Sequence, residues 1–203
     1  MIRRAFFLPL ILFFLPLHVF AQDTETLFSG DVNHGGFGSL IFGVTQANGE
    51  ATYLRGTRGA WVLNFSNDHT VNLGIGWYRT QSEFEATNWT LPDIEAPELR
   101  TNYSGFEIEY LNKSKRLIHY GGQLLIGGGN VRYKERSALD LESTSDRYFV
   151  LQPGLNAHLN ITNWFRINGG VMYRYADGVN LEGTSSSDLS GFSLILGLRF
   201  GKF

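Results

Sequence analysis

The sequence contains no cysteine, and no long uncharged apolar run follows residue 22. The first absence rules out disulfide bridges, which many small exported domains use for stability. The second rules out a transmembrane helix in that part of the chain, because a helix needs about 20 apolar residues to span a bilayer. Basic residues do not outnumber acidic ones either, since the whole chain carries a net charge of −2. Nothing therefore suggests a nucleic-acid partner, which would call for a basic patch.

The first 21 residues have the pattern of a secretory signal. Arg3 and Arg4 precede an apolar stretch at 5–17, and Ala21 offers the small residue of a cleavage site. The alternative is an uncleaved membrane anchor, but the apolar stretch is short and two prolines interrupt it. We therefore expect a cleaved signal peptide at 1–21 and export from the cytoplasm.

The remainder of the chain has the size of one domain. Cleavage after residue 21 of 203 leaves 182 residues, which is a natural length for a single domain. Removing two of the 17 basic side chains leaves 15 against 19 acidic ones, so the mature net charge is −4. We expect a short periplasmic linker at 22–34 and one folded domain at 35–203.

Segments of alternating polarity, separated by turn residues, indicate strands along the whole domain. The expected strands are 36–46, 51–65, 69–81, 102–111, 116–131, 147–160, 164–176 and 189–202. Their connections alternate between short turns and long polar loops, the long ones at 82–101, 132–146 and 177–188, and only 47–50 is short on the long side. Outer-membrane barrels have short periplasmic turns and longer exterior loops. The pattern predicts an all-β fold: an eight-stranded antiparallel up-and-down transmembrane β-barrel with both termini in the periplasm.

The closing strand shows the alternation most clearly. One parity is apolar throughout: Phe192, Leu194, Leu196, Leu198 and Phe200. The other parity is mostly small or polar, and alternate residues of a strand point to opposite faces, as in a barrel with lipid outside and polar groups inside. Arg55 is an exception because it shares the apolar parity of Trp61. A bulge near Gly56 would restore the alternation.

Aromatic residues gather near the predicted strand ends. Those expected toward the periplasm are Phe65, Tyr110, Trp164, Phe165 and Phe200, and those toward the exterior are Trp77, Phe106, Tyr133, Phe149, Tyr173 and Tyr175. Two such girdles anchor a barrel at the headgroup levels of the bilayer. The alternative is a soluble β-rich core, in which aromatics are common as strand formers.

Charged side chains of inward parity are the one group of residues that could support chemistry. They are Arg58, Glu107, Glu109, Arg166, Arg174 and Arg199. Eight strands enclose a lumen just wide enough for side chains to fill, and buried Arg–carboxylate pairs are tolerated where their hydrogen bonds are satisfied. We favour a charged plug that makes the barrel rigid. The alternative is a gated ion path or an acid–base pair.

Other candidate chemistry is weaker. His119 and His158 have inward parity and could be imagined as general bases, but no serine is aligned beside them, so we expect them to fill the lumen. The run Gly127–Gly129 lacks the Lys-Ser/Thr and the helix of a phosphate-binding loop, and a role in relieving crowding is favoured. We expect no catalytic, cofactor or metal site.

Short motifs spread over nearly the whole mature chain carry a resemblance. They are Gly-Gly-Phe-Gly (35–38), Arg-Gly-x-Arg-Gly-Ala-Trp (55–61), Leu-Leu-Ile-Gly-Gly-Gly (124–129), Pro-Gly-Leu-Asn (153–156), Phe-Arg-Ile (165–167), Tyr-Arg-Tyr (173–175) and the final Phe-Gly-Lys-Phe (200–203). On the basis of these motifs, the chain resembles the small OmpA/OmpX-like outer-membrane barrels of Gram-negative bacteria. It resembles an uncharacterised outer-membrane barrel family more closely. The resemblance implies fold rather than activity.

One feature departs from that pattern. A terminal phenylalanine is common in barrels recognised for membrane assembly, but Phe203 has inward parity. Either the register shifts at Gly201, or Phe200 takes the outward role.

The sequence is compatible with three functions. The leading one is a non-enzymatic structural or surface-interaction barrel that meets the exterior through its long loops. The acidic loop 82–101 is either a partner-facing or cation-binding surface or a solvated connection. The second is a narrow pore for ions or small solutes, and the third is a lipid-A-modifying enzyme. The expected partners are outer-membrane lipid and lipopolysaccharide, together with an unknown extracellular ligand, and we expect a monomer without cofactors.

Overall fold

Long β-strands make up most of the computed structural model, which describes residues 33–65, 68–80, 84–86, 89, 96–134 and 144–203. The strands are β1 (Asn33–Ala47), β2 (Glu50–Asn64), β3 (His69–Thr80), β4 (Phe84–Glu85), β5 (Glu98–Asn112), β6 (Ile118–Tyr133), β7 (Ser145–Asn160), β8 (Phe165–Asp177) and β9 (Gly191–Lys202). One short helix, α1 (Ser186–Leu189), precedes β9. Within the described ranges, no helix is long and apolar enough to cross a membrane.

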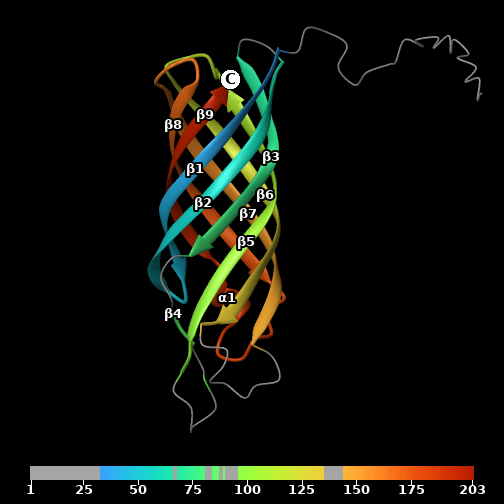
Figure 1. Ribbon diagram of the computed structural model, residues 1–203, viewed down its shortest axis with the longest axis vertical. Coiled ribbons are helices and arrows are strands. Elements are labelled where there is room, and N and C mark those ends of the chain that lie inside the picture. The colour runs from blue at the N-terminus through green and yellow to red at the C-terminus, as the bar shows by residue number, and fades with distance from the viewer. Residues whose placement is uncertain (1–32, 66–67, 81–83, 87–88, 90–95, 135–143) are drawn as a thin grey trace, which may run out of the picture. The chain divides into compact units, whose positions relative to one another are not determined.

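The eight long strands close into an antiparallel barrel (Figure 1). Each strand pairs with its neighbours in the chain, β1 pairs with β9, and pairing between β3 and β5 completes the circle. The two-residue strand β4 adds to β5 at the end with the long connections. The all-β, eight-stranded barrel predicted from the sequence is confirmed.

The strand ends differ from the expected ones where pairing continues past the apolar pattern. β5 begins at Glu98 rather than at 102, and β6 continues to Tyr133, because Leu99 pairs with Tyr133 and extends this hairpin. β1 begins at Asn33, two residues before the expected barrel boundary. The predicted signal peptide, 1–21, and linker residues 22–32 lie outside the described residues.

Strand parity separates an apolar outer face from the interior. In β9, Leu194 and Leu196 are exposed on the outside, whereas Ser193 is buried in the interior and donates a hydrogen bond to Thr45. The interior is not uniformly polar. Toward the end with the long connections it holds an apolar and aromatic cluster that includes Leu125 and Tyr148. That cluster fills this part of the lumen. The alternation of polar and apolar residues does not by itself predict an apolar cluster in the interior.

The expected bulge near Gly56 is wrong. The pairing of β2 with β1 and with β3 runs through Gly56 in an unbroken register. Arg55 therefore points outward, on the same face as Tyr53 and Thr57. It lies toward the end with the long connections, because the turn between β1 and β2 is at that end.

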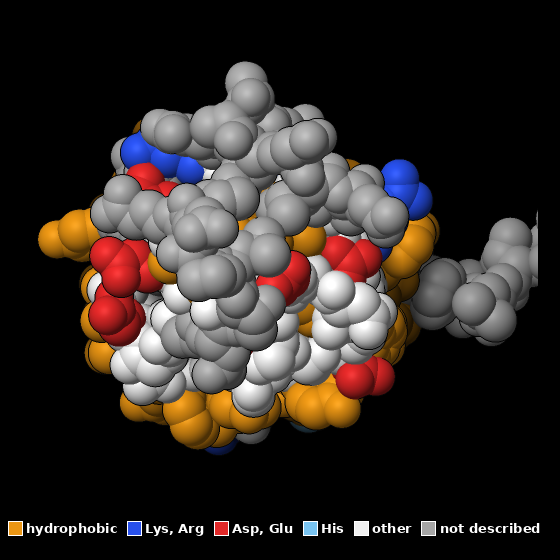
Figure 2. All heavy atoms as spheres, turned by 90° about the horizontal axis from the view of Figure 1, so that it is seen from below, with side chains coloured by type: hydrophobic (Ala, Val, Ile, Leu, Met, Phe, Trp, Pro, Cys, Tyr) orange, Lys and Arg blue, Asp and Glu red, His pale blue; other side chains and the backbone are white. Residues whose placement is uncertain are grey.

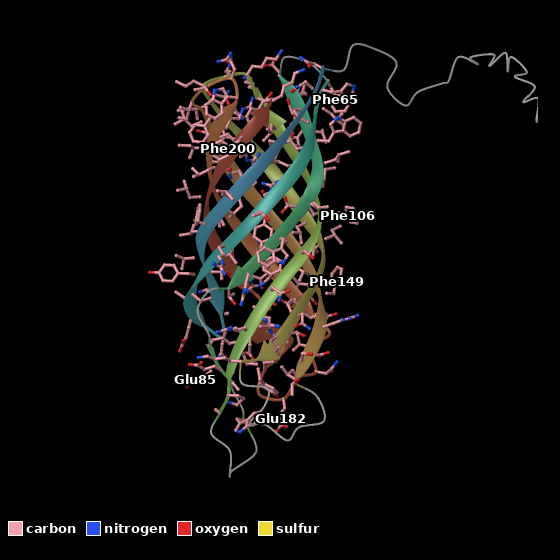
Figure 3. The ribbon with its side chains drawn as sticks, in the orientation of Figure 1. Phe65, Glu85, Phe106, Phe149, Glu182 and Phe200 are labelled. Carbon is pink, nitrogen blue, oxygen red and sulfur yellow. The ribbon has the colours of Figure 1, made fainter. Side chains whose placement is uncertain are left out.

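Most of the aromatic residues expected on the outer surface lie there, with one correction. Figure 3 places Phe65 and Phe200 toward one end, and Phe106 and Phe149 further toward the other. Tyr133 does not belong to the outer girdle, because its side chain is buried and its hydroxyl donates to the carbonyl of Glu182. Seen from the end with the long connections, hydrophobic side chains lie around the periphery, and acidic side chains lie at several places on this face (Figure 2).

The outer face gives a prediction about membrane depth. Leu196 lies in the middle of β9, and an arginine there would stand in hydrocarbon and lower the free energy of unfolding by about 2–4 kcal/mol. Tyr53, next to the β1–β2 turn and 68% exposed, is the control, since Tyr53→Arg should cost only about 0–1 kcal/mol near the interface. Urea unfolding of both variants in lipid vesicles measures the difference. Equal costs would contradict the assignment of this face to lipid.

Candidate functional site: a charge network in the barrel interior

Glu109 on β5 is the centre of the interior network. Both its oxygens accept hydrogen bonds from the guanidinium of Arg199 on β9, at 2.7 and 2.8 Å. Asn72 on β3 and Asn156 on β7 donate further hydrogen bonds to this carboxylate. The Glu109 side chain is completely buried, so these donors replace the water that an ionised carboxylate requires.

Arg58 on β2 joins a second carboxylate to the first. Its guanidinium forms an ion pair with Glu107 through Nε, and its Nη1 lies 3.7 Å from Glu109 Oε1. Nη1 also donates to Gln123 on β6, and the hydroxyl of Tyr78 donates to Glu107 at 2.6 Å. Two carboxylates and two guanidiniums therefore balance one another inside the barrel.

These contacts connect strands that do not pair with one another. β5 pairs with β3, β4 and β6, yet Glu109 also contacts β2, β7 and β9 through Arg58, Asn156 and Arg199. The network is thus a set of cross-lumen ties in addition to the backbone ladder. The network can therefore hold opposite walls of the barrel at a fixed separation and fill the space between them.

Arg166 and Arg174 share the interior but not this cluster. Arg166, at the end with the short turns, stacks on the ring of Phe203, with 3.9 Å between its Cζ and the ring centroid. Arg174, near the other end, donates from Nε to the carbonyl of Leu189 and from Nη2 to that of Gln46. The sequence pattern predicts that all six charges point inward, but only four of them form one network.

Phe203 closes the short-turn end of the lumen. The register of β9 with β1 continues through Gly201 without a shift, so the terminal ring turns inward and lies 5.9 Å from the ring of Phe37. Phe200 stays outside and stacks on Phe165 at 5.0 Å. The register does not shift at Gly201, so the second alternative is correct: Phe200, and not the terminal Phe203, faces outward.

The two histidines lie side by side in the lumen. His119 and His158 are opposite one another in the β6–β7 register and stack at 5.0 Å. His158 Nε2 is 3.6 Å from Glu109 Oε1, and the Nδ1 of His119 contacts the carbonyl of Arg116. Among the described residues, no hydrogen bond joins either ring to a serine, and no group of acidic and histidine side chains could hold a metal ion.

The glycines of β6 serve packing. A methyl group at Gly129 would overlap the ring of Tyr148, which occupies the interior beside it. This agrees with the expectation that the glycine run relieves crowding.

Sequence reasoning did not assign several uncharged members of the network. Tyr78 and Gln123 both have inward parity and both contact a charged member. A search for polar residues on the inward parity of every strand would have found them. Their partners depend on the register of strands that are far apart around the barrel.

Solved structures of known proteins share this fold. The crystal structure of Ail, the attachment invasion locus protein of Yersinia pestis, is 14% identical with a TM-score of 0.52, and the match covers 83% of this chain and 97% of Ail. The structure of Ail in complex with the heparin analogue sucrose octasulfate is 15% identical with a TM-score of 0.53 and the same coverage. Neisserial surface protein A (NspA) is 11% identical with a TM-score of 0.50, over 84% of this chain and 97% of that protein.

These likenesses concern the fold. The chain has the architecture of the small eight-stranded outer-membrane β-barrels. No protein-family model and no curated protein matches it. The narrower resemblance to one uncharacterised barrel family stays a prediction.

The network gives a prediction about stability. Replacing both Glu107 and Glu109 by Gln leaves Arg58 and Arg199 buried without a counter-charge, and we expect the free energy of unfolding to fall by at least about 3–5 kcal/mol. Urea titration of the refolded protein measures the loss. Glu85→Gln, at an exposed position beside the long connections (Figure 3), is the control and should change stability by less than about 0.5 kcal/mol. An unchanged midpoint in the double variant would mean that water solvates these carboxylates.

Proposed function

We propose that this protein is a non-enzymatic outer-membrane barrel that presents an ordered exterior surface on a rigid, closed scaffold. It is exported through its signal peptide, and the end with the long connections faces the outside of the cell. The observation that carries the proposal is the filled interior. Ion pairs tie opposite walls together in one part of the lumen, and apolar side chains pack in the other.

The connection between β8 and β9 packs against the end of the barrel. Leu189 of α1 is fully buried, and its carbonyl accepts the hydrogen bond from Arg174. Leu181 and Phe84 are buried as well, and Ser190 accepts a hydrogen bond from the backbone of Ala176. The described side chains of this connection therefore have fixed positions, which is what specific recognition of a partner requires.

The comparisons support the same class of function. Ail and NspA are named for attachment and for the cell surface, and Ail has been solved with a polyanionic ligand bound. The mature net charge of −4 and the exposed Glu85 and Glu182 at the exterior end point to a different ligand for this chain. We propose that this surface meets a partner that is neutral or cationic.

The orientation can be measured by thiol labelling, because the chain has no cysteine of its own. We expect Glu182→Cys, an exposed position beyond β8, to react with a membrane-impermeant maleimide on intact cells. Arg116→Cys, in the turn between β5 and β6, should react only after the outer membrane is permeabilised. The reverse pattern would contradict the proposed orientation.

The filled lumen predicts an absence of conductance. Refolded protein in planar bilayers should give no defined single-channel steps, because guanidinium and carboxylate groups occupy the cross-section. Stepwise currents would favour the narrow pore instead. Mass spectrometry of lipid A from cells with and without the protein checks the enzymatic alternative, and we expect identical masses.

A further inference from the structure

Three successive rows of outward residues cross β2, β3, β5 and β6 with a graded polarity. Counted toward the exterior end, the first row is Gly59, Ile75, Phe106 and Ile126, the second is Thr57, Trp77, Ser104 and Gly128, and the third is Arg55, Arg79, Asn102 and Asn130. Members of each row are register partners on adjacent strands. The rows pass from apolar, through hydroxyl and indole groups, to cationic and amide groups.

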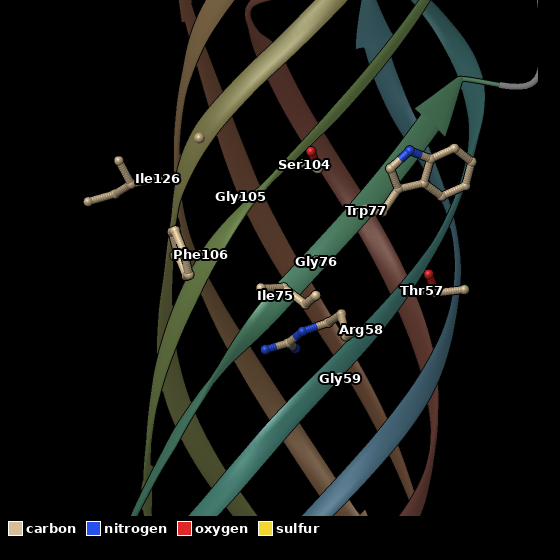
Figure 4. Close-up of a pocket in the computed structure, with 11 residues that line it drawn as sticks. Thr57, Arg58, Gly59, Ile75, Gly76, Trp77, Ser104, Gly105, Phe106 and Ile126 are labelled. Carbon is tan, nitrogen blue, oxygen red and sulfur yellow. The ribbon is translucent and has the colours of Figure 1, made fainter. Parts of the chain in front are cut away.

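The residues of the first two rows, apart from Gly128, line a groove in the outer wall with a volume of about 610 Å³ (Figure 4). Small residues at Gly59 and Ser104 leave room between the larger side chains of Trp77, Phe106 and Ile126, and backbone glycines line it as well. The groove is mainly apolar and opens on the face that the barrel turns to lipid. An acyl chain fits this surface better than a polar ligand does.

The third row places two like charges directly opposite each other. Arg55 and Arg79 are register partners on β2 and β3, and both point outward. Like charges in this position destabilise a sheet, and among the described residues neither guanidinium has a carboxylate partner. An anion between them would remove the repulsion and form charge-assisted hydrogen bonds with both.

We propose that these rows form a binding site for one phosphorylated glycolipid of the outer leaflet, lipopolysaccharide. A lipid-A phosphate lies between Arg55 and Arg79, the amides of Asn102 and Asn130 face the sugar, and one acyl chain occupies the groove. The inference rests on the proposed outer-membrane location and orientation, because the arginine row must lie in the outer leaflet. Four polar side chains in one row match a phosphorylated sugar, with its many acceptors, better than the single phosphate of a glycerophospholipid.

A second outer groove, of about 520 Å³, serves as an internal comparison. Leu155, Ala157, Val171 and Leu194 line it on β7, β8 and β9. The next outward residues toward the exterior on β8 and β9 are Tyr173 and Phe192, which pack against each other. The wall of this groove suits an acyl chain, but these next outward residues on β8 and β9 are not cationic, so we expect no selective binding of a phosphorylated lipid there.

Native mass spectrometry of the full mature barrel in detergent, titrated with bisphosphorylated lipid A, tests the site. We expect R55Q/R79Q to bind lipid A at least about tenfold more weakly than the wild type, which corresponds to about 1.4 kcal/mol. R116Q/K202Q removes two charges at exposed positions of the opposite end and should leave the affinity unchanged. S104F, which fills the first groove, should weaken binding, whereas A157F in the second groove should not.

Two results would overturn the site. One is equal lipid-A affinity of R55Q/R79Q and the wild type, and the other is phosphatidylglycerol binding as tightly as lipid A. Heat-modifiable gel migration shows that each variant is folded, and R55Q/R79Q keeps the test decisive if S104F does not fold. The thiol labelling at position 182 reports the orientation independently. Correct labelling with no loss of binding therefore refutes the lipid site alone, while reversed labelling refutes the proposed function.

Discussion

The carboxylate of Glu109 has no access to water, and the rest of the interior is arranged around it. An ionised carboxylate in such a place costs several kcal/mol unless charges and hydrogen bonds replace its hydration. Arg199, Arg58, Asn72 and Asn156 supply them, and they come from four different strands. A barrel whose strands moved apart would leave this group unpaired. The closed shape and the charge network therefore stabilise each other.

This constraint links the inside of the barrel to its outside. With the interior filled, we propose that the lipid-facing wall and the exterior end carry the function of the protein. Near the exterior end of the wall, Arg55 and Arg79 stand above the groove lined by Trp77 and Ser104. The exterior end is held by buried contacts such as that of Arg174 with the carbonyl of Leu189. A rigid interior fixes both surfaces at once.

The sequence was sufficient to predict the barrel, its strands and the inward direction of six charges, because alternation has a period of two and each strand reveals its own faces. It was not sufficient to predict which charges meet. Arg166 and Arg174 have the same parity as Arg199, yet only the position along each strand decides that Arg199 reaches Glu109. Contacts across the lumen depend on the stagger of all eight strands, which no local pattern contains.

The outward Arg55 shows a second limit of the pattern. Alternation assumes that a charge on the apolar parity is a local defect, and so it suggested a bulge. The unbroken register places Arg55 opposite Arg79, toward the end with the long connections. Height along the barrel, and not parity alone, determines which side chains the lipid face accepts.

The central claim is that Glu109 and Arg199 couple opposite walls of the barrel. A double-mutant cycle with Glu109→Gln and Arg199→Gln, read by urea unfolding in lipid vesicles, measures that coupling directly. We expect each single variant to cost about 3–5 kcal/mol and the double variant to cost clearly less than their sum. The exposed pair of Glu98 and Lys134, with oxygen and nitrogen 2.6 Å apart, is the control and should couple by less than about 1 kcal/mol. Additive costs for Glu109 and Arg199 would contradict the account.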